Sequence, residues 1–552
     1  SAHVIYEDYK KRIWVGTWSE GLFLLENPYD MKHLRWKKFV HQNGNPNSLS
    51  DNIVYSISED LNTHTLWVGT RSGLSITPQD GSGYFINYLP ESKSYPLISN
   101  EVNSIIRDHF GMMWMGTIGG GVCWVSTRQT HFNQYNIESI KSELPTNSVK
   151  SLYVDDDGLV WMGIGTYGLA AYNPKNNVCN YYPKIPEFSN ISSMPTVNTI
   201  VRMKRTNELW IGTYDGGIYV YKKGQKVKVM LPENTPFLKE ACVSAIKEDR
   251  KGNCWIGTRS GLCVRYNNGK GYIFNTLLVN NKDLSRCTIR SLCEDNDGTI
   301  WCGTGNYGLI RLSGNLQNPK LTKFTQYSLS NNKLNCLDAL CLFKDNIGRL
   351  WLGTEGGGLN LYDREKDTFI SINKLINLPG DVVSSIQQDK KGNLWLGTNY
   401  GLVRLRVEKN LKESSFRVYT TADGLQDNFF IQNSSFNKNG ELFFGGYKGY
   451  NSFFPDRMEE NVMKVPVVIT DIKILNQSFG TLDDELRNRV SEETPGFTKR
   501  IELPYKYKNF TIDFAALVYN NSRGNKYAYK LEGFDKDWQY TDALRRFANY
   551  NN

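Results

Sequence analysis

The sequence predicts an all-β protein, in which β-propellers of four-stranded antiparallel blades precede an Ig-like β-sandwich. Two observations carry this prediction: a tryptophan motif that recurs at nearly constant spacing, and the loss of that repeat after Pro455, where longer alternating strands begin. Composition agrees with it. Aromatic residues make up 13% of the 552 residues and there are 48 glycines, which favours short strands and tight turns over helices.

The repeated motif is a tryptophan followed by a variable residue, a glycine and usually a threonine. Successive copies are 44 to 53 residues apart, close to the length of a propeller blade. A tenth, decayed copy has Phe443 in the tryptophan position, in the sequence LFFGG. The nine tryptophans are Trp14, Trp67, Trp114, Trp161, Trp210, Trp255, Trp301, Trp351 and Trp395.

The copy that begins at Val382 shows the parts of one repeat. It contains four candidate strands, VVSSIQQD, LWLGT, LVRLRV and FRVYT, separated by the turns DKKGN and NYG and a longer link. Four such strands form one twisted antiparallel blade, and stacking blades around an axis buries both faces of each. We expect Trp395 to act as a wedge between blades and the Gly-Thr pair to end the strand.

The Asp-x-x-Gly turns, such as DDDG at 155–158, could be mistaken for calcium loops. They lack the alternating oxygen ligands and the distal glutamate of such a loop, so we interpret them as hairpin turns capped by the aspartate. The ten cysteines form no CxxC pair and lie mostly in apolar strand patterns, which favours small buried side chains. We predict no metal and no cofactor.

The motif count predicts three regions. Residues 1–127 would hold the last three blades of one propeller, residues 128–458 a complete seven-bladed propeller, and residues 459–552 the start of the sandwich. Upstream blades are expected to be missing from the first ring. The Phe443 repeat lacks an outer strand, so we predict that 131–137 pairs with its third strand and closes the second ring.

The repeats resemble the two-component regulator propeller repeat, which has a strand, Asp-x-x-Gly, Leu-Trp-Ile-Gly-Thr and Gly-Leu. The segment from Tyr505 resembles the three-tyrosine domain that follows such propellers. Its matching positions are Asn509, Phe514, Tyr527, Tyr529, Leu531, Glu532, Gly533, Phe534 and Trp538.

This resemblance implies the periplasmic sensor region of a hybrid two-component system in a Gram-negative bacterium. Such regions bind oligosaccharides, act as homodimers and signal through one membrane helix to a cytoplasmic histidine kinase, receiver and DNA-binding module. The sequence itself matches no kinase, receiver or membrane helix. On this basis the expected partners are an oligosaccharide, a second copy of the chain and the membrane at the periplasmic face of the inner membrane.

The distribution of titratable residues argues against catalysis. Of the six histidines only His131, the first residue of the predicted closing strand, falls within 128–458, so the seven repeats of the complete ring have no histidine for acid–base or metal chemistry. A carboxylate pair acting on glycans, with Asp215 and Glu355 as the candidates, is the remaining enzymatic alternative. A protein-binding scaffold is a third possibility. We expect this region to contain no catalytic residues.

The turns between second and third strands are the predicted binding positions, because glycines fix the backbone there while the residues between them vary. Tyrosine faces with Arg, Asn and acidic side chains suit a sugar. The alternative is that several of these tyrosines merely pack on neighbouring blades. The candidates are Tyr167, Tyr214, Asp215, Arg259, Asn306, Tyr307, Glu355, Asn399 and Tyr400 in the turns, Arg286 and Asn428 in incoming links, and Arg71 in the first ring.

The charge balance narrows the ligand class only slightly. The net charge is +9, but lysines and arginines are scattered among 56 acidic residues without a basic block. We therefore expect no nucleic-acid partner. The positive charge slightly favours an acidic glycan, bound through arginines, over a neutral one.

Overall fold

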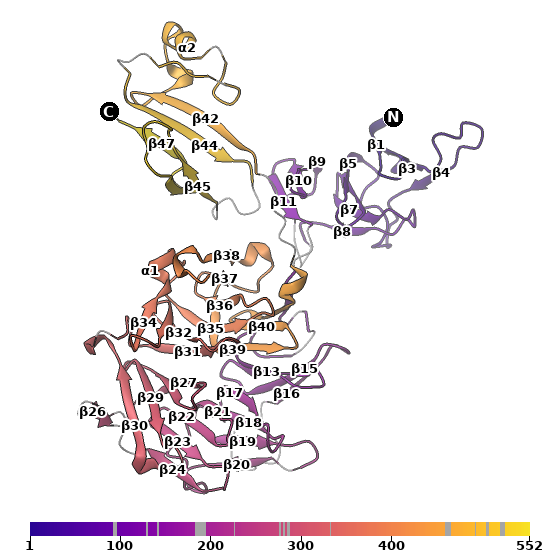
Figure 1. Cartoon of the computed structure of the whole chain (residues 1–552). Coiled ribbons are helices and arrows are strands. Elements are labelled where there is room, and N and C mark those ends of the chain that lie inside the picture. Colours follow the sequence, from indigo (N-terminus) through magenta and orange to yellow (C-terminus); the bar gives the residue numbers. More distant parts are fainter. Residues whose placement is uncertain are drawn as a thin grey trace. The chain divides into compact units, whose positions relative to one another are not determined.

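The computed structural model describes residues 1–551 except 92–96, 128–130, 138, 141–142, 183–194, 226, 275–277, 280–281, 284–286, 332, 459–464, 492, 499, 504–506 and 519–524. The chain divides into two compact units, one made of residues 1–129 and 461–552 and the other of residues 130–460 (Figure 1). In the described part of the chain, no helix is both long enough and apolar enough to cross a membrane.

The second unit contains seven four-stranded antiparallel sheets within its described residues. Each of the first six sheets keeps its strands in chain order. They are β13 (Val149–Val154), β14 (Val160–Ile164), β15 (Leu169–Asn173) and β16 (Val178–Tyr182); β17 (Val197–Arg202), β18 (Leu209–Thr213), β19 (Ile218–Tyr221) and β20 (Lys228–Met230); β21 (Val243–Glu248), β22 (Cys254–Thr258), β23 (Gly261–Arg265) and β24 (Gly271–Phe274); β27 (Ile289–Glu294), β28 (Ile300–Thr304), β29 (Leu309–Gly314) and β30 (Thr322–Tyr327); β31 (Ala339–Lys344), β32 (Leu350–Thr354), β33 (Leu359–Asp363) and β34 (Thr368–Ser371); and β35 (Val383–Gln388), β36 (Leu394–Thr398), β37 (Leu402–Arg406) and β38 (Ser415–Tyr419).

The seventh sheet combines β39 (Phe430–Lys438), β40 (Glu441–Gly446) and β41 (Gly449–Phe453) with β12 (Asn133–Tyr135) from the other end of the unit. In it Asn133 lies opposite Ser452 and Tyr135 opposite Tyr450. The prediction that the 131–137 segment pairs with the third strand of the Phe443 repeat is confirmed. The first strands of successive sheets pack against one another, and β13 packs against β39, so the seven sheets form a closed ring.

Short elements lie in the links between sheets, in the links between the third and fourth strands of a sheet, and after β41. Between sheets are the β25 (Leu278–Val279) and β26 (Lys282–Asp283) hairpin, η2 (Leu329–Asn331), helix α1 (Ile372–Ile376) and η4 (Thr421–Asp423). Within sheets are the 3-10 turns η1 (Pro319–Leu321) and η3 (Leu411–Glu413), and η5 (Pro455–Arg457) follows β41.

The N-terminal part of the first unit contains three more sheets of the same kind. The third has three strands among the described residues, since β12 joins the second unit. The strands are β1 (Ala2–Glu7), β2 (Ile13–Thr17), β3 (Leu22–Leu25) and β4 (Trp36–Phe39); β5 (Val54–Asp60), β6 (Thr65–Thr70), β7 (Gly73–Pro78) and β8 (Ile86–Tyr88); and β9 (Val102–Arg107), β10 (Met112–Thr117) and β11 (Gly121–Ser126).

The C-terminal part of the first unit is also a β structure, as the alternating pattern after Pro455 predicts. One sheet has the order β43-β42-β44-β47 and a second has β45-β46. That these sheets belong to an Ig-like sandwich stays a prediction. The elements are β42 (Val467–Ile474), β43 (Gln477–Ser478), η6 (Phe479–Thr481), α2 (Asp484–Val490), β44 (Phe510–Ala516), β45 (Lys526–Tyr529), β46 (Gln539–Asp542) and β47 (Phe547–Tyr550).

Tryptophan and glycine of the repeat have distinct packing roles. Trp395 is fully buried and packs with Phe430 and Phe444 of the following sheet, so its predicted role as a wedge between blades is confirmed. A Cβ atom on Gly397 would lie 2.4 Å from Ser385 Oγ and 2.9 Å from Phe430 Cβ. Glycine is needed there because the first strands of two neighbouring sheets approach that closely.

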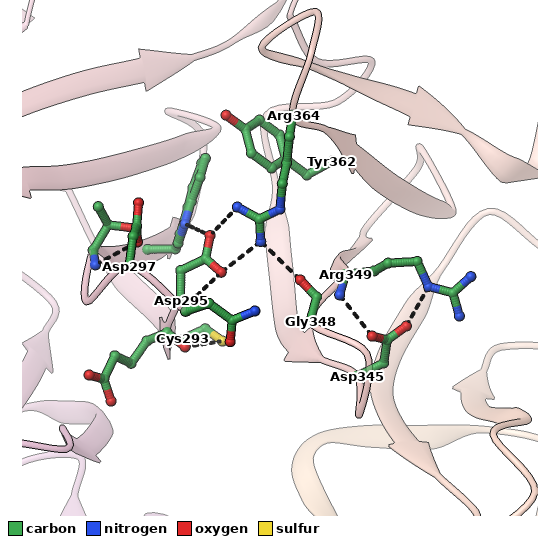
Figure 2. Close-up of polar contacts among 12 residues, drawn as sticks. Cys293, Asp295, Asp297, Asp345, Gly348, Arg349, Tyr362 and Arg364 are labelled. Carbon is green, nitrogen blue, oxygen red and sulfur yellow. Dashed lines mark hydrogen bonds and ion pairs between the residues drawn. The ribbon is translucent and has the colours of Figure 1, made fainter.

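Polar contacts also join neighbouring sheets. Arg364 donates both terminal guanidinium nitrogens to the buried Asp295 carboxylate, at 2.9 and 2.7 Å, and also donates to the Gly348 carbonyl (Figure 2). Asp295 follows β27 and Arg364 follows β33, so this bidentate ion pair links the fourth and fifth sheets of the ring.

None of the ten cysteines forms a disulfide bond in the described structure, and five of them are buried. Burial raises the pKa of Cys254 and Cys287 to about 12, which keeps both thiols neutral. The prediction that the cysteines serve as small apolar side chains holds for these five.

Candidate ligand-binding face

The turns between second and third strands are held by a threonine hydroxyl, which explains why their tips can vary. Thr398 Oγ1 donates to the Gly401 carbonyl at 2.7 Å and accepts the Tyr400 N–H at 2.9 Å. Gly401 has a φ of 115°, which favours glycine. Thr213, Thr258, Thr304 and Thr354 make the same bond to the closing glycine of their turns. The backbone is thus fixed independently of the residues between threonine and glycine.

A pocket of about 470 Å³ opens on this face of the ring, a volume within the usual range for small-ligand sites. Two of the predicted residues, Tyr214 and Arg259, line it and are in contact. Arg259 Nη1 donates to the Tyr214 hydroxyl at 3.2 Å, from the next sheet of the ring. The lining comprises Lys150, Asn198, Tyr214, Cys242, Ser244, Arg259, Thr288, Arg290, Ile431, Gln432 and Asn433.

The Ile431–Asn433 part of the lining comes from an irregular stretch of β39. The register of β39 against β40 shifts between Phe430 and Ser435, and Asn433 has a φ of 61°. From this bulge Gln432 Nε2 donates to the carbonyls of Arg290 and Leu340, at 3.1 and 2.6 Å. The seventh sheet is thereby hydrogen-bonded to the fourth and fifth sheets across the ring. We call residues 431–433 the bulge.

The walls come from one position of the repeat that the sequence analysis missed. Lys150, Asn198, Ser244 and Arg290 are each the second residue of the first strand of four successive sheets. The sequence signal was limited to a polar residue directly after the Val or Ile that begins each of these strands.

The pocket has a positive character. Among the described residues that line it are Lys150, Arg259 and Arg290, and none is a carboxylate. Arg290 Nη1 is paired with Asp338 at 3.0 Å and with Glu355 at 3.3 Å. Burial raises the pKa of Cys242 to about 11, so this thiol adds no negative charge at neutral pH.

The carboxylate pair considered for glycan hydrolysis has no support from this geometry. Glu355 is engaged by Arg290, and Asp215 is exposed outside the pocket lining. The two residues lie in the turns of the second and fifth sheets of the ring, and neither lines the pocket.

The remaining predicted residues are spread over the face. Tyr167 and Tyr400 are exposed, at 50% and 62%, and lie outside the pocket lining. Tyr307 is half-buried against the apolar cluster around Trp255, a contact of the kind that the packing alternative describes. Tyr447, 59% exposed in the equivalent turn of the seventh sheet, was missed because its repeat has decayed.

The predicted asparagines mostly stabilise the conformations of their own loops. Asn306 has a φ of 69°, a turn conformation that asparagine tolerates. Asn399 Nδ2 donates to Asp381 at 3.4 Å, and Asn428 Oδ1 accepts the Thr421 N–H at 3.0 Å. Arg286 lies outside the described residues.

Arg71 belongs to a separate pocket in the N-terminal sheets. That pocket measures about 410 Å³ and includes Trp18, His41 and Asp51. Arg71 Nε is 3.3 Å from the Asp51 carboxylate, so its charge is already paired.

Comparisons with known proteins agree with this fold. The sequence profile of the two-component regulator propeller matches residues 96–119, 143–166, 283–306 and 377–400, and each match contains one of the repeated tryptophans. The chain is 29% identical over 357 residues to "Histidine kinase P4" of Formosa agariphila, covering 62% of this chain and 25% of that protein. It therefore spans about a quarter of the length of this curated relative.

A solved structure has the same fold. The extracellular domain of BT3049 from B. thetaiotaomicron, described as a hybrid two-component system, matches with a TM-score of 0.69 at 23% identity, over 100% of this chain and 68% of that chain. Four segments of the chain therefore match the two-component regulator propeller repeat, within a fold shared with this extracellular domain.

Proposed function

We propose that the chain is the ligand-sensing region of a membrane-bound hybrid two-component system and that it binds an oligosaccharide. The observation that carries the proposal is the pocket around Tyr214, Arg259 and Arg290, on the face where the turn tips vary. Its volume of about 470 Å³ suits one or two sugar rings.

The lining groups match the chemistry of a sugar. Lys150, Arg259 and Asn198 offer donors for hydroxyl oxygens, and the Tyr214 ring offers an apolar face for a pyranose. Arg290 is already paired with Asp338 and Glu355, but Lys150 and Arg259 line the pocket without an ion pair among the described residues, so an acidic glycan is favoured over a neutral one.

The proposal extends to the whole protein through its relatives. We propose that the region faces the periplasm, that a membrane helix connects it to a histidine kinase, and that it acts as a homodimer. Ligand binding would then favour one of two dimer arrangements and change the expression of glycan-utilisation genes. On this proposal the region itself is not an enzyme.

Calorimetry against a panel of neutral and acidic oligosaccharides tests the proposal. We expect binding without product, and at least roughly tenfold weaker binding for Arg259→Ala, since a charged hydrogen-bond donor is lost. Arg406→Ala is the matched control, because Arg406 is exposed and pairs only locally with Glu408 at 2.8 Å. Released product would favour a glycan-cleaving enzyme, and capture of a protein partner without any glycan binding would favour a scaffold.

A further inference from the structure

A second, larger pocket lies on the face of the ring that carries the Asp-x-x-Gly turns. Its volume is about 940 Å³ and its lining is Lys204, Arg205, Lys247, Glu248, Asp249, Arg250, Lys251, Gly252, Asn267, Leu292, Cys293, Glu294, Leu342, Phe343 and Lys344. Strands β21 and β27 contribute to both this pocket and the Tyr214 pocket, but no residue lines both. Ser244 lines one pocket and Lys247 the other, three residues and about 10 Å further along β21.

The acidic residues of this lining already accept hydrogen bonds or form ion pairs within the ring. Glu294 pairs with Arg250 at 2.9 Å. Glu248 accepts the backbone N–H groups of Lys204 and Arg205. Asp249 accepts the Trp255 indole N–H at 2.9 Å and is buried. None of these three carboxylates is available to neutralise a lysine ammonium.

Two half-buried lysines are left without a counter-charge. Within the described part of the chain, the ammonium groups of Lys247 and Lys344 have neither an ion pair nor a hydrogen bond. They come from β21 and β31, on the two sides of β27, and both act electrostatically on Cys293 between them. Burial raises the pKa of Cys293 to about 11, so the thiol is neutral and does not serve as their partner.

Part of the pocket lining is apolar. Leu292, Leu342 and Phe343 contribute to it together with Cys293. Half-buried cations beside apolar surface gain more from an anion than solvated surface lysines do, since the surrounding medium screens the attraction less. The lining carries six lysines and arginines against three acids.

We propose that this pocket binds a small polyanion, whose carboxylate, sulfate or phosphate groups lie between Lys247 and Lys344. The site shares no lining residue with the proposed oligosaccharide pocket, and its Lys247 lies three residues further along β21 than Ser244 of that pocket. It gives the ring a second ligand-binding face that is independent of the proposed function.

Calorimetry of the full chain with inorganic pyrophosphate, citrate and sucrose octasulfate tests the site and identifies the preferred anionic group. We expect at least one of them to bind, with an affinity that falls as sodium chloride is raised. The double variant Lys247→Gln/Lys344→Gln should bind that anion roughly tenfold more weakly or worse. Lys247→Arg/Lys344→Arg, which keeps both charges, should retain binding.

Lys391→Gln is the matched control, since Lys391 is exposed in the equivalent turn of the sixth sheet and outside this lining. It should leave the affinity unchanged. Absence of binding for all three anions overturns the proposal, as does equal affinity in the Gln double variant. Arg259→Ala distinguishes the two sites, because it should weaken glycan binding and leave the anion affinity unaltered.

Discussion

At the scale of single residues, one aspartate of the repeat does more than cap a turn. In seven repeats the tryptophan indole N–H donates to the aspartate six residues earlier, at 2.9 to 3.4 Å. Trp67 and Trp210 have Leu61 and Lys204 at that place, and they donate instead to Thr65 and Glu208. The Asp-x-x-Gly turn therefore holds the wedge between blades in its rotamer.

The turn at 155–158 offers a matched test, because it contains a buried and an exposed aspartate. Asp155 accepts the N–H groups of Asp157 and Leu159 and the Trp161 indole, whereas Asp157 is exposed. Asp155→Ala should lower the free energy of unfolding by about 2–4 kcal/mol, since buried donors lose their acceptor. Asp157→Ala should change it by less than about 0.5 kcal/mol. Urea denaturation followed by tryptophan fluorescence measures both, and equal losses would contradict this role of Asp155.

At the scale of sheets, the outer strands are joined by a second kind of contact. Tyr327 on β30 and Tyr362 on β33 both donate to Asp367, at 2.5 and 2.7 Å, and Lys333 forms an ion pair with it. Arg311 on β29 is 3.3 Å from the same carboxylate. One aspartate thus links the fourth and fifth sheets at their outer side.

This carboxylate gives the linked sheets a pH dependence. Burial alone would raise the pKa of Asp367, but the hydrogen bonds from Lys333, Tyr327 and Tyr362 lower it to about 2. Since the unfolded chain binds this proton at a higher pH than the folded one, the stabilisation is complete above about pH 4 and is lost as the pH falls toward 2. The stability difference between the native chain and Asp367→Asn should therefore shrink between pH 4 and pH 2. A difference that stays constant in urea titrations over this range would contradict the assignment.

Some contacts between sheets could be predicted from the sequence and others could not. The β12–β41 pairing was predictable, because the decayed repeat lacks an outer strand and 131–137 is an outer-type strand without a sheet. The β39 bulge was not, since nothing in the local pattern says that Gln432 reaches carbonyls 92 and 142 residues away. Of the predicted binding residues, Tyr214 and Arg259 meet at the pocket, while the packing of Tyr307 depends on a neighbouring sheet.

At the scale of the whole molecule, the ring of residues 130–460 is closed by its own first strand, β12, which completes the last sheet. Phe132 is buried beside Tyr419 and Phe453, and Tyr135 stacks on Tyr450 with ring centroids 4.5 Å apart. Asn451 Nδ2 donates to the Asn133 carbonyl at 3.1 Å. Without β12, the backbone of β41 and the rings of Tyr450 and Phe453 would face water.

Two fragments test whether this closure stabilises the ring. Residues 130–460 contain every described strand of the unit and should unfold cooperatively on their own, whereas residues 139–460 lack only β12 and its flanks. Removing Phe132 and Tyr135 together with the strand pairing should cost roughly 5 kcal/mol, because burial of each ring contributes about 2–4 kcal/mol. Urea denaturation of both fragments measures the difference. In the full chain Phe132→Ala should show part of the same loss, and Phe429→Ala, at a ring that is 52% exposed, should not. Equal denaturation midpoints for the two fragments would mean that the ring holds without its closing strand.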